Sequence, residues 1–155
     1  TASMPDWYFA YGSNMNPARV TARGLAFDMA RGGRLPGVGL TFNKQSRDHP
    51  GCGHANLTFS KDACVEGVLY RLRDPADIVL MDRFERVPIN YRRDVVQVIA
   101  DDTHVAAWTY FANPAVIRAG LRPERAYLQH LLAGRPFLTA AYFDWLCATA
   151  CVDDR

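Results

Sequence analysis

The feature that most constrains the fold is a strand-rich middle section of the chain. Residues 25–59 are rich in glycine and in short apolar runs, which is typical of strands joined by loops. Asp101 and Asp102 separate two longer apolar segments, a pattern that indicates a hairpin turn. The predicted strands of this section are residues 40–42, 55–59, 64–72, 91–100 and 104–111.

The two ends of the chain add one strand and most of the helices. Residues 7–11 form an apolar and aromatic run that stops at Gly12, which predicts a buried strand. Asn16 is a good N-cap and is followed by a proline, so a helix is predicted over residues 17–23. Asp74 caps a second predicted helix in the same way. The predicted class is α+β, with a mixed, barrel-like sheet and flanking and C-terminal helices over residues 75–84, 124–133 and 139–147.

Length and composition limit the other possibilities. A chain of 155 residues that is 49% hydrophobic is expected to form one domain, residues 1–155, with its own core. A net charge of +2 does not favour a nucleic-acid partner, and no run of about 18 apolar residues could span a membrane. The N-terminus has no signal-peptide pattern, so we expect a cytoplasmic protein, with Met4 as the native start and Thr1–Ser3 as an added leader.

The four cysteines are expected to be reduced thiols. Cys147 and Cys151 are four residues apart on a predicted helix, and we interpret them as two small buried side chains. A metal or redox role for this pair is the alternative. Cys52, His54 and Cys64 form a second alternative metal or thiol site, although their spacing is a poor zinc pattern. We expect no metal and no cofactor.

The loop after the first strand is the first candidate for ligand binding. Gly12, Ser13 and Asn14 lie between the end of a strand and the start of a helix, where backbone N–H groups are unpaired. Such amides can hold a carboxylate or a developing oxyanion, and the glycine allows a ligand to approach closely. The same three residue types are also common in turns that bind nothing, so this loop alone does not establish a ligand-binding site.

One of three glutamates stands out as a candidate acid. Glu124 begins a predicted helix, where an acid is expected simply for the helix dipole, and Glu66 lies in a strand. Glu85 falls on the apolar face of its predicted helix, where burial would raise its pKa toward neutrality and suit it to proton transfer. The alternative is that the helix ends before Glu85, which then pairs with a neighbouring arginine.

These residues carry a family resemblance. The segment 8–15, with its Tyr-Gly-Ser-Asn, resembles the YGSN signature of the γ-glutamylcyclotransferases. Residues 81–88 resemble that family's LDxxEGV segment, and the catalytic glutamate of the segment falls on Glu85. Arg86 departs from the pattern, because it stands where the family usually has glycine. The resemblance extends from Tyr8 to about Gly134 and includes three pocket tyrosines, which match Tyr91, Tyr110 and Tyr127.

The resemblance implies a reaction and a set of site residues. The α-amine of a γ-glutamyl compound attacks its own γ-carbonyl, which releases 5-oxoproline and a free amine, with Glu85 as general acid and base. The expected partner is this small substrate, without nucleic acid or membrane, and a homodimer is left open. The alternatives are a non-catalytic binder of acidic metabolites and an enzyme that removes γ-glutamyl groups in a specialised pathway. The implied substrate-binding residues are Tyr11, Gly12, Ser13, Asn14, Met15, Tyr91, Tyr110 and Tyr127.

Overall fold

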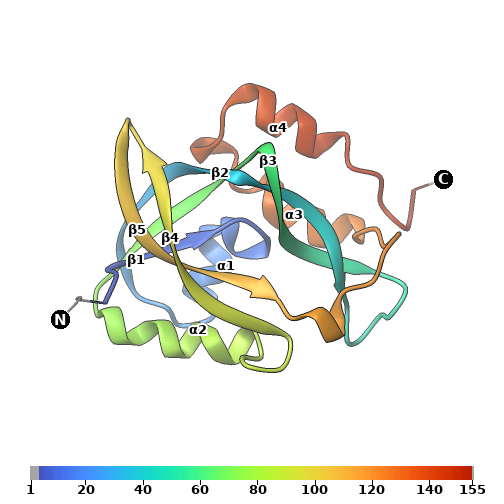
Figure 1. The fold of residues 1–155 in the computed structure, drawn as a ribbon, viewed down its shortest axis with the longest axis horizontal. Helices are drawn as coiled ribbons and strands as arrows, with labels where there is room; N and C mark the ends of the chain where they lie inside the picture. Colours follow the sequence, from blue (N-terminus) through green and yellow to red (C-terminus); the bar gives the residue numbers. More distant parts are fainter. Residues whose placement is uncertain (1–3, 155) are drawn as a thin grey trace.

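The computed structural model describes residues 4–154, and five strands within this range close into a barrel (Figure 1). Their order around the barrel is β1-β3-β2-β4-β5, and the pairing of β1 with β5 is parallel whereas the other pairings are antiparallel. The predicted mixed, barrel-like sheet is confirmed. The strands are β1 (Trp7–Ala10), β2 (Phe27–Gln45), β3 (Gly53–Leu72), β4 (Tyr91–Ala100) and β5 (Thr103–Ala112). The prediction for Thr1–Ser3 concerns residues outside the described range.

The helices begin at the capping residues that the sequence indicates. The side chain of Asn16 accepts a hydrogen bond from the backbone N–H of Ala18 (3.1 Å), and that of Asp74 accepts one from Ala76 (3.0 Å). The predicted helix 75–84 begins as a 3₁₀ turn, η2 (Pro75–Asp77), before it becomes α2. The helices are α1 (Pro17–Ala22), α2 (Ile78–Phe84), α3 (Arg125–Leu132) and α4 (Ala140–Cys147), with α2 and α4 on opposite sides of the barrel (Figure 1).

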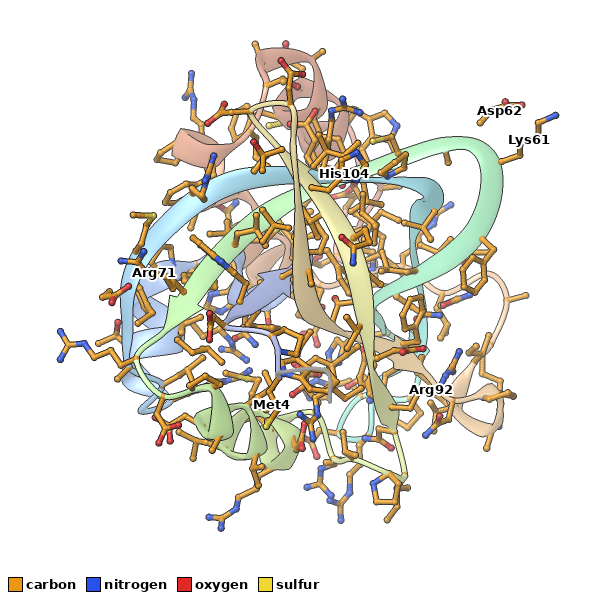
Figure 2. All side chains as sticks on the ribbon, turned by 60° about the vertical axis from the view of Figure 1, so that its left-hand side comes forward. Met4, Lys61, Asp62, Arg71, Arg92 and His104 are labelled. Carbon is orange, nitrogen blue, oxygen red and sulfur yellow. The ribbon has the colours of Figure 1, made fainter. Side chains whose placement is uncertain are left out.

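Strands β2 and β3 are much longer than predicted, with 19 and 20 residues. They pair along most of their length, and the register shifts at Phe27/Met29, Pro36/Val38 and Thr41/Lys44. Such irregularities bend a strand and interrupt its alternation of apolar and polar residues. This is why the sequence shows only short apolar runs there. The exposed part of β3 that carries Lys61 and Asp62 projects away from the barrel (Figure 2).

The core has two parts because neighbouring strand residues point to opposite sides of the sheet. Phe9 belongs to a cluster made of strand residues, which fills the barrel. Tyr8 belongs to a second cluster, which joins the outer side of the sheet to the helices through Met81 of α2 and Leu128 of α3. The β4–β5 hairpin turns at Asp101 and Asp102 as predicted, with φ angles of 47° and 64°.

The cysteine prediction is wrong for Cys147. This residue is exposed at the end of α4, because Leu146 beside it occupies the buried face of the helix. Cys151 is buried as predicted, but it lies beyond the helix, and its backbone N–H donates to the Asp154 carboxylate (2.8 Å). All four cysteines are free thiols. Within residues 4–154, no helix is long and apolar enough to cross a membrane.

Candidate active site

A cavity of about 280 Å³ lies where the loop after β1 meets the end of α2. It is lined by all the predicted site residues except Met15. Met15 is fully buried in the core instead, where its side chain packs against Gly134. The predicted residues that the fold brings together around the cavity are Tyr11, Gly12, Ser13, Asn14, Glu85, Tyr91, Tyr110 and Tyr127.

The loop after β1 presents backbone amides to the cavity. The N–H groups of Gly12, Ser13 and Asn14 have no hydrogen-bond acceptor within residues 4–154. A Cβ atom on Gly12 would lie 3.0 Å from the Cβ of Ala55 and 3.3 Å from the Tyr127 hydroxyl. Glycine therefore allows the loop to approach β3 and α3 closely, and it keeps the cavity open at this point.

Hydrogen bonds within the protein hold the Asn14 side chain in place. Its Nδ2 donates to the Tyr8 hydroxyl (2.9 Å) and lies 3.4 Å from Oε1 of Glu85. Its Oδ1 accepts a hydrogen bond from Nη1 of Arg23 (3.0 Å). Arg23 therefore fixes the orientation of the amide, and the amide in turn contacts Glu85.

Glu85 combines parts of the two alternatives that the sequence leaves open: the helix ends before it, but within residues 4–154 it forms no ion pair with a neighbouring arginine. Helix α2 ends at Phe84, and Glu85 caps it, with its backbone N–H donating to the carbonyl of Met81 (3.0 Å). The residue is nevertheless half-buried and lines the cavity. Burial raises the pKa of the Glu85 carboxyl from 4.5 to about 7. The positive charges of Arg23, Lys44 and Arg19 oppose this rise, and the negative charge of Asp82 adds to it.

Arg86, which departs from the LDxxEGV pattern, lies in the turn after Glu85. The φ angle of Arg86 is 51°, in the left-handed region that favours glycine. A glycine, as in the LDxxEGV segment that this stretch resembles, suits this backbone, and a residue with a Cβ such as arginine adopts it at a cost of about 1–2 kcal/mol. The backbone carbonyl of Arg86 accepts hydrogen bonds from the N–H groups of Ile89 (2.8 Å) and Asn90 (2.9 Å), which hold the turn in place.

A buried polar network fixes α2 to the sheet. The Tyr110 hydroxyl donates to Oδ1 of Asp82 (2.7 Å), and Nε of Arg93 contacts the same oxygen (3.1 Å). The Tyr11 hydroxyl donates to the backbone carbonyl of Tyr110 (2.5 Å). Because Asp82 precedes Glu85 on the same helix end, this network determines where Glu85 lies.

Two tyrosines bracket Ala55 of β3. The Tyr91 hydroxyl donates to the Ala55 carbonyl (2.8 Å), and the Tyr127 hydroxyl accepts from the Ala55 N–H (2.9 Å). The Tyr127 hydroxyl therefore keeps its own proton for another acceptor. Burial raises the pKa of both phenols, so they are neutral donors at physiological pH.

The cavity also contains Lys44 and Ser46, which the sequence analysis did not single out, and His54, which it considered only for a metal or thiol site. Lys44 and His54 are paired across β2 and β3, a long-range register that no local pattern reveals. The His54 ring stacks on Tyr127, with centroids 4.5 Å apart. Burial and the charge of Lys44 lower the pKa of His54 to about 4, so the imidazole is neutral at pH 7.

The alternative metal site does not form. In the described part of the chain, the one group of potential ligand atoms close enough to share an ion belongs to Cys151, Asp153 and Asp154, outside the cavity. Cys52, His54 and Cys64 are therefore not brought together. Asp154 in that group is already paired with Arg125 (2.6 Å).

Comparison with known proteins identifies the family of this barrel. The family model described as gamma-glutamyl cyclotransferase, AIG2-like, matches residues 8–130. The chain belongs to this family. No curated protein matches the sequence.

Solved structures share the fold at low sequence identity. An uncharacterized protein from Homo sapiens matches with a TM-score of 0.84 and 23% identity, over 99% of this chain and 92% of that one. A protein described as gamma-glutamyl cyclotransferase matches with a TM-score of 0.83 and 23% identity, over 96% and 89% of the two chains. YkqA from Bacillus subtilis matches with a TM-score of 0.81 and 23% identity, over 96% of this chain and 56% of that one. These similarities establish the fold alone.

Proposed function

We propose that the chain is a γ-glutamylcyclotransferase. The α-amine nitrogen of a γ-glutamyl compound attacks the γ-carbonyl carbon, the bond from that carbon to the leaving nitrogen breaks, and 5-oxoproline and a free amine are released. Glu85 takes the proton of the α-ammonium group and returns a proton to the leaving nitrogen. The reaction uses no water, no external nucleophile and no cofactor.

The observation that carries this proposal is the pKa of about 7 for Glu85 in a cavity of suitable size. A carboxyl group with this pKa is present in both protonation states at neutral pH, so it can accept a proton and return it. A solvent-exposed glutamate with an ordinary pKa would be a weaker base. Asn14, held by Arg23, supports the position of the carboxylate that must reach both nitrogens.

The remaining groups bind and orient the substrate. The free amides of Gly12, Ser13 and Asn14 hold either the α-carboxylate or the oxyanion that develops on the γ-carbonyl. The surrounding tyrosines confine the glutamyl chain in a curled conformation. In favourable cases such orientation lowers a barrier by up to ~7–11 kcal/mol.

A non-catalytic binder of acidic metabolites is the second candidate, and the excess of cationic groups around the cavity is the observation that favours it. Glu85 separates the two functions. A carboxylate inside the cavity repels an anionic ligand and is of no use to a binder, whereas the cyclisation requires it. An enzyme that removes γ-glutamyl groups in a specialised pathway would use the same chemistry.

The test is to incubate the protein with γ-glutamyl-alanine and measure 5-oxoproline. Glu85→Gln keeps the size of the side chain and is expected to lose ~10²–10⁴-fold in turnover, as for other general acid–base groups. Glu66→Gln is the matched control, because Glu66 lies outside this cavity and binds Thr139 instead. If folded Glu85→Gln retains turnover, Glu85 is not the general acid and base, and another residue must transfer the proton.

A further inference from the structure

Lys44 is a largely buried cation that, within residues 4–154, has the face of an aromatic ring beside it but no acidic partner in an ion pair. Its relative exposure is 4%, and its ammonium group forms no ion pair or hydrogen bond with any residue in the range 4–154. Its Nζ lies 5.8 Å from the centre of the Tyr91 ring, at the wall of the cavity. Buried charges are normally paired, because removing them from water is costly. An ammonium group without an ion pair at the wall of a cavity is therefore suited to bind an anionic group of the ligand.

Ser46 completes this part of the cavity. It follows Lys44 by two residues, just beyond the end of β2 at Gln45, and both residues line the cavity. Ser46 is also 4% exposed and lines the cavity. Its Oγ accepts a hydrogen bond from the backbone N–H of His49 (3.2 Å), which leaves the hydroxyl proton available to a ligand. A buried ammonium and a buried hydroxyl together suit a carboxylate.

The excess of positive charge around the cavity favours a substrate with a second carboxylate. Among the described residues that line it, five are lysines or arginines, and only Asp48 and Glu85 are acids. The γ-glutamyl group is itself neutral overall, because its α-ammonium and α-carboxylate cancel. A substrate whose leaving amine also carries a carboxylate is anionic, and it complements this cavity better than one whose leaving amine is uncharged.

The geometry of the reaction indicates where the carboxylate of the leaving amine lies in the cavity. Glu85 must reach both the attacking and the leaving nitrogen, and in a γ-glutamyl amino acid each nitrogen is bonded to a carbon that carries a carboxylate. Positive charge acts on Glu85 from two sides, from Arg19 and Arg23 of α1 and its C-terminal end, near the Gly12–Asn14 loop, and from Lys44 on β2. The cations and amides on the loop side can bind the α-carboxylate of the glutamyl group. Lys44 is then available to bind the carboxylate of the leaving amine.

We propose that Lys44, together with the Ser46 hydroxyl, binds the carboxylate of the leaving amine and so selects γ-glutamyl amino acids or peptides over γ-glutamyl amines. This inference rests on the proposed cyclotransferase function. It assigns Lys44 as a specificity-determining residue. When Glu85 accepts the proton of the α-ammonium group, Lys44 loses a compensating negative charge, and the substrate carboxylate replaces it.

The experiment compares γ-glutamyl-alanine with γ-glutamyl-ethylamide, which differ only in the carboxylate. The parent protein is expected to prefer γ-glutamyl-alanine in kcat/KM by about 10- to 100-fold, the range for one charge-assisted hydrogen bond. Lys44→Met should bring the kcat/KM ratio of the two substrates close to one, and any effect of the lost charge on the pKa of Glu85 acts on both substrates and cancels in this ratio. Binding of 5-oxoproline, which lacks the leaving amine, should change less than about threefold, below the effect of one ordinary hydrogen bond. Lys61→Met, which removes the exposed lysine on β3, is the matched control and should behave as the parent.

Three results would overturn the inference. Equal kcat/KM of the parent for both substrates contradicts the preference itself, and this result does not depend on whether Lys44→Met folds. An equal loss on both substrates, with weaker 5-oxoproline binding, would assign Lys44 to the α-carboxylate instead. If the parent makes no 5-oxoproline at all, the proposed function fails, and calorimetric binding of the two compounds still tests the carboxylate preference: equal affinities would refute it.

Discussion

The Glu85 carboxylate is expected to destabilise the folded protein at high pH, so Glu85→Gln should be more stable than the parent there. An acid whose pKa is higher in the folded state stabilises the protein below its unfolded pKa, and this contribution is lost as the pH rises through the folded pKa. For Glu85 the window runs from 4.5 to about 7. A pKa rise of this size corresponds to about 3 kcal/mol at pH 8, and the glutamine variant avoids this cost.

Thermal unfolding at a series of pH values measures this effect. In a chain of this length, about 3 kcal/mol raises Tm by up to about 10 °C. The gain of Glu85→Gln over the parent should be greatest at pH 8 and disappear near pH 4.5. Glu66→Gln removes the same charge at a site where the carboxylate binds Thr139, and no gain is expected. An equal or lower Tm for Glu85→Gln at pH 8, or a gain that does not vary with pH, would refute the reasoning.

Three further predictions follow from the surroundings of the site. Gly12→Val should weaken 5-oxoproline binding measured by calorimetry at a modest loss of Tm, because its Cβ would crowd Ala55 and Tyr127; parent-like affinity would make the loop a simple turn. Arg86→Gly should raise the free energy of unfolding in urea by up to ~1 kcal/mol, because glycine accepts the positive φ; a lower value would show that the arginine side chain stabilises the turn. EDTA should leave 5-oxoproline formation unchanged, whereas inhibition that zinc reverses would support a metal role for Cys52 and His54.

The parts of the fold that local chemistry determines could be predicted from the sequence. Asn16 and Asp74 cap helices through their own side chains, and the two aspartates at 101–102 adopt the backbone conformation of a tight hairpin. Glu85 was marked by its match to the glutamate of the LDxxEGV segment, while the periodicity around it left burial and a helix end both open, and the helix does end at Phe84. In these cases the signal lies within a few residues of the feature that it determines.

The remaining parts depend on contacts between distant segments. The bulges that bend β2 and β3 break the alternation of apolar residues, so the long strands look like short ones. Lys44 enters the cavity only because the register places it opposite His54, and nothing in its neighbours marks it as buried. The contact between the Asn14 amide and Glu85 also depends on Arg23, nine residues later, which holds the amide oxygen, and no local pattern indicates this bond.

The most direct test of the proposed cyclisation is the identity of the product from a substrate with and without a free α-amine. γ-Glutamyl-alanine and its N-acetyl analogue are incubated with the protein, and glutamate and 5-oxoproline are separated by chromatography. If the α-amine is the nucleophile, the first compound gives 5-oxoproline and the second gives no product, because acylation removes the lone pair from reaction. Glutamate as the primary product would contradict the mechanism even if Glu85 is essential, since a carboxylate base serves a water nucleophile equally well.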